Sequence, residues 1–228
     1  MQQGEGKDLV FLHGYLSSKE SFYPQINYFS RHFRVTAPDL PGFGGSGPIP
    51  AAWSVGEYAD WLEGFLKERG IVFPCVIAHS FGGRVAIKCL ARGLFDRAVL
   101  TGCAGIVRRR TLSYHLRVKS YRLVRKFAPR FAEAKFGSAE YRSLSPLMRE
   151  SYKKIVNEDL REEAKRIARP VLYLNGERDR ETPLSSVRIL HECTAGSQLA
   201  VLKGCGHFAH LEEPLLFDLA AEEFLNDA

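Results

Sequence analysis

Six short, mostly apolar runs that alternate with amphipathic stretches constrain the fold of this chain most. Nearly continuous apolar runs are typical of strands that are buried on both faces of a parallel sheet. Amphipathic stretches such as residues 55–69 and 82–92 predict helices that cover such a sheet. The apolar runs occupy residues 9–12, 34–37, 75–78, 98–101, 171–174 and 199–202. This alternation predicts an α/β fold with a doubly wound, mostly parallel sheet of about six strands.

The alternation is interrupted between Gly105 and Pro170. Residues 106–166 lack a strand pattern, and their apolar residues recur at steps of four and seven, as on one face of a helix. We therefore predict a helical insertion at residues 106–166, within a core built from residues 1–105 and 167–228. The insertion carries six aromatic residues that could line a pocket or, as we favour for most, pack its helices onto the core: Tyr114, Tyr121, Phe127, Phe131, Phe136 and Tyr141.

The positive charge of the chain is concentrated in the same insertion. The whole chain has 32 Lys and Arg against 26 Asp and Glu, a net charge of +6. Residues 106–135 alone hold ten basic residues and one acidic residue, Glu133. Such a segment could bind nucleic acid or an anionic membrane, but a charge run is more often a solvated helix face. We favour the solvated face and expect no specific nucleic-acid partner.

The composition and the cysteine pattern indicate a globular chain without a membrane span. With 45% hydrophobic and 25% charged residues, disorder and fibrous repeats are excluded. The longest apolar run, residues 71–78, contains a proline, whereas a membrane-spanning helix needs about 20 apolar residues. The first residues lack the apolar centre of a signal peptide. The five cysteines are scattered without a C-x-x-C pair, so we expect reduced thiols and a cytoplasmic protein.

The sequence A-H-S-F-G-G at residues 78–83 lies where a predicted strand ends and a predicted helix begins. A serine in such a sharp turn needs small neighbours, and the usual pattern is G-x-S-x-G. Ala78 replaces the first glycine and is the smallest substitute for it. The N–H groups at the start of the helix behind Ser80 can stabilise a developing oxyanion. Ser80 is therefore a candidate nucleophile, and the alternative is a structural turn that contains a serine.

An acid and a histidine follow two later strands in the same way. Asp179 follows the strand at residues 171–174, and His207 follows the strand at residues 199–202. The carboxyl ends of parallel strands meet at one edge of a sheet, which is where ligands bind in open α/β folds. We therefore expect Ser80, Asp179 and His207 to lie together and to form a catalytic triad.

These features resemble the α/β-hydrolase superfamily over nearly the whole chain. Three further motifs carry the resemblance: H-G at residues 13–14, D-L-P-G-F-G-G-S at residues 39–46 and G-H-F-A-H-L-E-E-P at residues 206–214. By this similarity, the insertion at residues 106–166 is a cap that covers the active site. The resemblance implies a small-molecule substrate, and acyl transfer to water would need no cofactor. The histidines include no H-E-x-x-H pattern, so we expect no metal.

The resemblance also implies the roles of the site residues. Ser80 would attack a substrate carbonyl after His207 takes its proton, and Asp179 would orient His207. The backbone N–H groups of Tyr15 and Phe81 would form the oxyanion hole. In this interpretation the chain is a hydrolase with a serine nucleophile that acts on ester bonds.

The chain departs from the superfamily at its N-terminus. Only seven residues precede Asp8, whereas the family usually begins with a two-stranded hairpin. We therefore expect the hairpin to be missing and the strand at residues 33–37 to lie at an edge of the sheet. Because an unpaired edge can pair with another chain, either a monomer or a homodimer is consistent with the sequence.

Other motifs have weaker claims to a function. The run G-F-G-G-S-G at residues 42–47 matches a dinucleotide-binding pattern, but the P-I-P that follows prevents the helix which that site needs. His207 and His210 have no third metal ligand in view. Glu177 is a rival for Asp179, although the family's G-x-x-D spacing favours Asp179. Three more residues are interpreted as packing residues: His79, Cys103 and Cys205.

The substrate class is the least constrained inference. We favour a carboxylesterase-like transfer of an acyl group to water from a small ester or a related carbonyl compound. Residues 82–86, G-G-R-V-A, are similar to the menaquinone-pathway lyase of this superfamily, which uses the same triad to eliminate pyruvate from an anionic substrate. A second alternative is a receptor-like relative that binds a ligand with little turnover.

Overall fold

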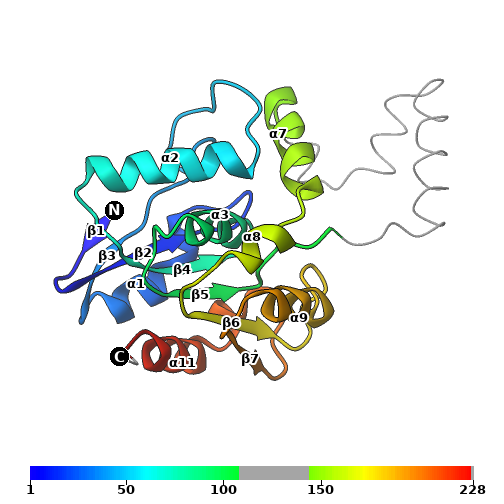
Figure 1. The fold of residues 1–228 in the computed structure, drawn as a ribbon. Coiled ribbons are helices and arrows are strands. Elements are labelled where there is room, and N and C mark those ends of the chain that lie inside the picture. Colours follow the sequence, from blue (N-terminus) through cyan, green and yellow to red (C-terminus); the bar gives the residue numbers. More distant parts are fainter. Residues whose placement is uncertain (108–143, 227–228) are drawn as a thin grey trace.

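The computed structural model describes residues 1–107 and 144–226 of the chain. Seven strands in this part form one sheet (Figure 1). The strands are β1 (Gln2–Gln3), β2 (Lys7–Leu12), β3 (Phe33–Thr36), β4 (Cys75–His79), β5 (Ala98–Thr101), β6 (Val171–Gly176) and β7 (Gln198–Leu202). Their order is β1-β3-β2-β4-β5-β6-β7, and all neighbours from β3 to β7 are parallel. The predicted α/β sheet is confirmed, and each predicted run forms one of the parallel strands.

The first strand corrects one detail of the prediction. Gln2 and Gln3 of β1 pair antiparallel with Thr36 and Val35 of β3, so β3 is not the edge of the sheet. The turn behind β1 needs glycine, because Gly4 has a φ of 81° and a Cβ on it would lie 2.3 Å from a backbone oxygen. Since β1 pairs with this side of β3, β3 is not the free edge through which a homodimer could have formed, and the choice between monomer and homodimer stays open.

Helices cover both faces of the sheet. They are η1 (Lys19–Phe22), α1 (Tyr23–Phe29), α2 (Val55–Glu68), α3 (Phe81–Ala91), α7 (Pro146–Asn157), α8 (Arg161–Lys165), α9 (Leu184–Cys193), α10 (Ala209–Glu212) and α11 (Pro214–Asn226). Side chains of β2 alternate between the two faces: Leu9 and Phe11 pack with α1 and α11, whereas Val10 and Leu12 pack with α2, α3 and α9. Figure 1 shows α2 and α3 on one side of the sheet and α11 on the other.

The strand β7 is more exposed than the prediction of strands buried on both faces implies. Its residues are exposed or half-buried, and Val201 is 36% exposed. The reason is its place in the sheet, because β7 is the last strand and has a neighbour, β6, on only one side. Its carboxyl end nevertheless lies at the same edge as those of β4 and β6.

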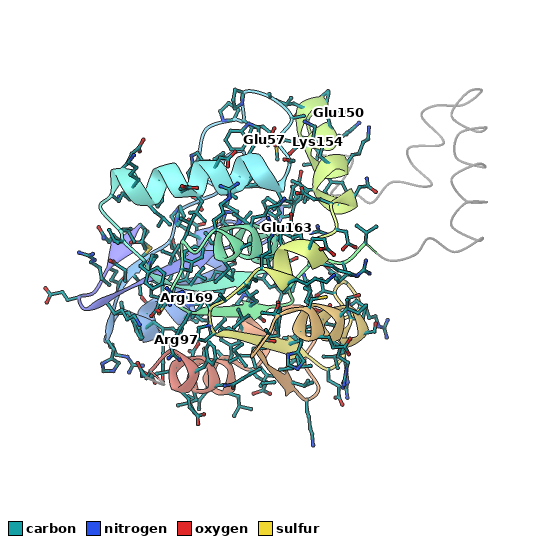
Figure 2. All side chains as sticks on the ribbon, in the orientation of Figure 1. Glu57, Arg97, Glu150, Lys154, Glu163 and Arg169 are labelled. Atoms are coloured by element: carbon teal, nitrogen blue, oxygen red, sulfur yellow. The ribbon has the colours of Figure 1, made fainter. Side chains whose placement is uncertain are left out.

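The described end of the insertion, α7 and α8, packs on the side of the sheet that carries α2 and α3. Ser151 of α7 donates a hydrogen bond to the carbonyl of Trp53 (2.6 Å). Glu163 of α8, which is labelled in Figure 2, pairs with Lys88 of α3 (2.9 Å). The division into core and insertion stays a prediction. Residues 108–143, with most of the basic segment and all six of the cap aromatics, lie outside the described residues.

Candidate active site

Ser80 occupies a strained turn between β4 and α3. Its φ is 51° and its ψ is −107°, in a region that side chains other than glycine rarely adopt. Such a conformation costs about 1–3 kcal/mol and persists only where the surrounding structure holds it in place. The Ser80 N–H donates to the carbonyl of Thr101 at the end of β5 (3.0 Å). The turn therefore has the geometry that the sequence pattern predicts for an exposed nucleophile.

The small residues next to Ser80 are required by close packing. A Cβ on Gly82 would lie 2.2 Å from the carbonyl oxygen of Leu12, so α3 begins in direct contact with the end of β2. Ala78, which replaces the usual glycine, is completely buried in β4. The structure accommodates this methyl group without disturbing the ladder to β5, where Ala78 pairs with Leu100.

Asp179 and His207 are in direct contact. His207 Nδ1 lies 2.9 Å from Asp179 Oδ2. Asp179 Oδ1 accepts hydrogen bonds from the N–H groups of Glu181 and Thr182, both at 2.9 Å, and the Thr182 hydroxyl donates to Oδ2 at 2.6 Å. Burial acts to raise the pKa of Asp179, but the hydrogen bonds from His207 and Thr182 outweigh it and lower that pKa. The carboxylate is therefore ionised at neutral pH and orients the imidazole.

The structure places Ser80 and His207 on either side of the end of β5. Thr101 accepts from the Ser80 N–H, and a Cβ on the next residue, Gly102, would lie 3.0 Å from His207 Nδ1. In the part of the chain that the structure describes, no hydrogen bond joins Ser80 Oγ to His207. Catalytic hydrogen bonds are often long without substrate and tighten when it binds. Of the three predicted triad residues, Asp179 and His207 thus form a hydrogen-bonded pair, and Ser80 lies beside them without a hydrogen bond to His207.

The loop that follows β2 lies against the Ser80 turn. A Cβ on Gly14 would lie 3.5 Å from the Cβ of Ser80. His13 holds this loop: its Nε2 accepts from the Leu40 N–H (2.9 Å), so its proton lies on Nδ1, which donates to the Gly14 carbonyl (2.8 Å). Burial lowers the pKa of His13 and keeps this neutral form.

Tyr15 and Phe81, the two predicted oxyanion-hole residues, are neighbours. Their rings are in edge contact with centroids 5.5 Å apart. The Tyr15 hydroxyl also donates to the carbonyl of Met148 in α7 (3.1 Å), which connects the loop to the insertion. The direction of their backbone N–H groups toward a substrate stays a prediction.

His79 contributes more than packing, which the sequence did not indicate. Its Nε2 donates to the backbone carbonyl of His207 (3.0 Å), and the two rings lie 4.6 Å apart. Burial, with the nearby charges of His210 and His207, holds the pKa of His79 well below its ordinary value. His79 is therefore a neutral donor that fixes the loop of His207, consistent with the prediction that it is not a second base.

Two residues of the acid loop, Thr182 and Glu181, contact the Asp179–His207 pair and were not identified from the sequence. Thr182 donates to Asp179, as described above. Glu181 Oε2 lies 3.4 Å from His207 Nε2, the nitrogen that faces away from Asp179. Glu177 is not a rival acid in this geometry, because its carboxylate accepts from the Gly204 N–H (3.0 Å). The D-x-E-T-P spacing could have indicated Thr182, since an Asp side chain often accepts from N–H groups two and three residues on.

The remaining motifs have structural roles. Asp39 binds the backbone N–H groups of Lys19 (2.8 Å) and Gly45 (2.9 Å), and Gly44, with a φ of 50°, leaves room for its carboxylate. The glycine-rich run is a turn, as predicted, and the next helix starts only at Val55. Burial raises the pKa of Cys103 to about 12, and Cys205 is buried as well.

Neither a metal cluster nor a spanning helix is found among residues 1–107 and 144–226. These residues contain no group of three or more His, Cys, Asp or Glu side chains arranged to hold a metal ion. The helices described there are too short or too polar to cross a membrane.

Known proteins with similar sequences and structures place the chain in a family. A model of the alpha/beta hydrolase family matches residues 9–218. The 2-succinyl-6-hydroxy-2,4-cyclohexadiene-1-carboxylate synthase of Salmonella paratyphi B is 31% identical over 234 residues, covering 90% of this chain and 88% of that protein. The (E)-2-((N-methylformamido)methylene)succinate hydrolase of Acinetobacter baylyi is 43% identical over 84 residues, only 37% of this chain and 32% of that protein.

A solved structure supports the same assignment at the level of the fold. An esterase from Exiguobacterium antarcticum matches with a TM-score of 0.80 and 21% identity, covering 100% of this chain and 94% of that chain. At this identity the likeness concerns the fold alone. From the match to residues 9–218 and the relative that is 31% identical over most of its length, the chain belongs to the α/β hydrolase family.

Proposed function

We propose that this protein is a serine hydrolase that transfers the acyl group of a small ester to water. The observation that carries the proposal is the Asp179–His207 contact of 2.9 Å, held beside a serine in the strained turn that exposes a nucleophile. Each of the three residues follows its own parallel strand. A buried structural turn would not need an ionised carboxylate that orients an imidazole next to it.

The reaction follows from the roles of these groups. Ser80 Oγ attacks the ester carbonyl while His207 Nε2 takes the hydroxyl proton, and Asp179 stabilises the resulting imidazolium. The N–H groups of Tyr15 and Phe81 stabilise the tetrahedral oxyanion, each by about 3 kcal/mol in comparable sites. The imidazolium then protonates the alcohol oxygen as the ester bond breaks. Water, activated by His207 in the same way, releases the acid and restores Ser80.

The experiment that tests the proposal compares two serine variants. Initial rates of hydrolysis of p-nitrophenyl acetate, butyrate and octanoate are measured for the wild type, Ser80→Ala and Ser185→Ala. Ser185 is an exposed serine on α9 and is the matched control. We expect turnover that Ser80→Ala abolishes and Ser185→Ala retains, with both variants folded by circular dichroism. Full activity of Ser80→Ala would refute the assignment of the nucleophile.

A lyase reaction with the same triad is the second candidate. It is favoured by the relative named 2-succinyl-6-hydroxy-2,4-cyclohexadiene-1-carboxylate synthase and by the G-G-R-V-A run. The arginine of that run, Arg84, is buried and donates to the backbone carbonyl of Glu158 (2.7 Å), so part of its hydrogen-bonding capacity holds the end of α7. Release of pyruvate from the substrate of that relative, dependent on Ser80, would favour the lyase over the esterase.

A receptor-like relative with little turnover is the third candidate, and multiple-turnover kinetics separates it from both enzymes. A burst of about one product per protein molecule, followed by no further release, is the result expected of a receptor. Continued release at a constant rate is the result expected of an enzyme.

A further inference from the structure

The nitrogen of His207 that must handle the catalytic proton already has an acidic neighbour. Nδ1 is engaged by Asp179 (2.9 Å), which leaves Nε2 for proton transfer. Glu181 Oε2 lies 3.4 Å from Nε2. The proposed steps of Ser80, Asp179 and His207 do not require this carboxylate.

The backbone of Glu181 is held firmly, whereas its carboxylate is open to solvent. Its N–H donates to Asp179 Oδ1, and the N–H and hydroxyl of the next residue, Thr182, bind the same carboxyl group. The Glu181 side chain is 70% exposed, against 8% for His207. Among the described residues, the imidazole of His207 is the only basic group within 4.0 Å of the Glu181 carboxylate, and the neighbouring Arg180 does not pair with it. The negative charge is thus positioned by the acid loop but not neutralised by it.

The Glu181 carboxylate lies near the place where the leaving alcohol of an ester substrate must bind. The oxygen of a leaving alcohol must come within about 3 Å of His207 Nε2 to receive its proton. Because Glu181 Oε2 is 3.4 Å from the same nitrogen, that oxygen passes within about 6 Å of the carboxylate. The acyl chain is bonded to the carbonyl carbon on the other side of the breaking bond. The alcohol part of the substrate is therefore the part that meets Glu181.

We propose that Glu181 is a specificity residue for the leaving group: its carboxylate favours esters whose alcohol carries a positive charge and disfavours esters whose alcohol carries a negative charge. This inference rests on the proposed function. The electrostatic energy between the Glu181 carboxylate and the charged alcohol is modest, because the carboxylate is exposed to solvent and screened by salt. Where the charged atom of the alcohol lies about 6 Å from the carboxylate, in a largely aqueous environment, one charge changes the ratio of rates about threefold.

The test uses two esters of nearly the same shape. Butyrylcholine has a cationic alcohol, and 3,3-dimethylbutyl butyrate replaces its quaternary nitrogen by carbon. The ratio of kcat/KM for the two esters is measured by pH-stat at low ionic strength for the wild type, Glu181→Gln, Glu181→Lys and Glu68→Gln. Glu68 is the control. It is exposed at the carboxyl end of α2, from which the chain leads to the amino end of β4, whereas the triad residues follow the carboxyl ends of their strands.

We expect the ratio to fall about threefold in Glu181→Gln and about tenfold in Glu181→Lys, and to stay unchanged in Glu68→Gln. In 0.5 M NaCl the differences should shrink. A purely structural role of Glu181 would lower the rates for both esters equally and leave the ratio unchanged. Equal ratios in the wild type and both Glu181 variants would overturn the proposal.

A binding measurement separates failure of this inference from failure of the proposed function. The product alcohols, choline and 3,3-dimethylbutan-1-ol, are titrated into Ser80→Ala with and without Glu181→Gln and followed by NMR. The preference for choline should fall about threefold with Glu181→Gln even though no turnover occurs. If the wild type hydrolyses neither ester, the proposed function fails, and this titration still decides the role of Glu181. An unchanged preference would refute it.

Discussion

Gly82→Ala tests whether the contact between α3 and the end of β2 positions the active site. A Cβ at this residue would lie 2.2 Å from the carbonyl oxygen of Leu12 and 2.7 Å from that of His13. These are backbone atoms, so no side chain can rotate away. A normal carbon–oxygen contact is about 1 Å longer than the first of these distances, and either the start of α3 or the loop after β2 must move by about that amount.

This displacement should have a small effect on stability and a large effect on the catalytic rate. Overpacking of this kind costs about 1–3 kcal/mol, and alanine recovers up to about 1 kcal/mol as the better helix former. The net loss of about 1–2 kcal/mol corresponds to a decrease in Tm of about 5 °C for a chain of this size. Since the same backbone carries Phe81 and the loop of Gly14, a shift of 1 Å should lower kcat about 100-fold.

The matched control is Gly64→Ala in α2. Gly64 is also helical, but a Cβ on it has no atom within 4 Å. Alanine should therefore stabilise the helix by about 1 kcal/mol, raise Tm by about 2–4 °C and leave kcat unchanged. Both variants are measured by thermal denaturation and by ester hydrolysis. Wild-type kcat and Tm in Gly82→Ala would refute the reasoning, because the close approach could then not exist.

Two further predictions concern buried groups. The half-buried Cys193 should be the one cysteine of the folded protein that reacts with Ellman's reagent at pH 8, because the other four cysteines are buried. Cys193→Ser should abolish this reaction until denaturant is added. A second thiol that reacts quickly in the folded protein would contradict the prediction. Burial raises the pKa of Asp218 to about 6. The native state therefore binds a proton at this carboxyl group more tightly than the unfolded chain does. The free energy of unfolding falls as the pH rises from about 4 through about 6. Asp218→Asn should therefore raise Tm relative to the wild type at pH 8 and not at pH 4.5, and an equal effect at both pH values would show that Asp218 does not titrate in this way.

The strand pattern explains why the candidate triad could be located without coordinates. Apolar runs bounded by turn residues depend on local sequence, and all parallel strands end at the same edge of their sheet. Residues that follow such runs, Ser80, Asp179 and His207, are therefore expected near one another. The strand β1 was missed because it is only two polar residues long, Gln2 and Gln3, and carries no apolar signal.

The contacts around the pair depended on distances that no local pattern encodes. The roles of His79 and Glu181 follow from where the loop after β7 lies relative to β4 and to the loop after β6. Hydrogen bonds such as that from His79 to the carbonyl of His207 join segments that are distant in the sequence. A pattern of residue types shows that a histidine is buried, but not which carbonyl it meets.

Local periodicity and turn chemistry were thus enough to determine the α/β class, the parallel strands and the order of serine, acid and histidine, because these properties depend on residues close together in the chain. Tertiary packing alone decided the protonation state of His13, the ionised state of Asp179 and the placement of Glu181 beside Nε2 of His207. Those properties depend on burial and on distances of about 3 Å between separate loops, and only the folded chain sets them.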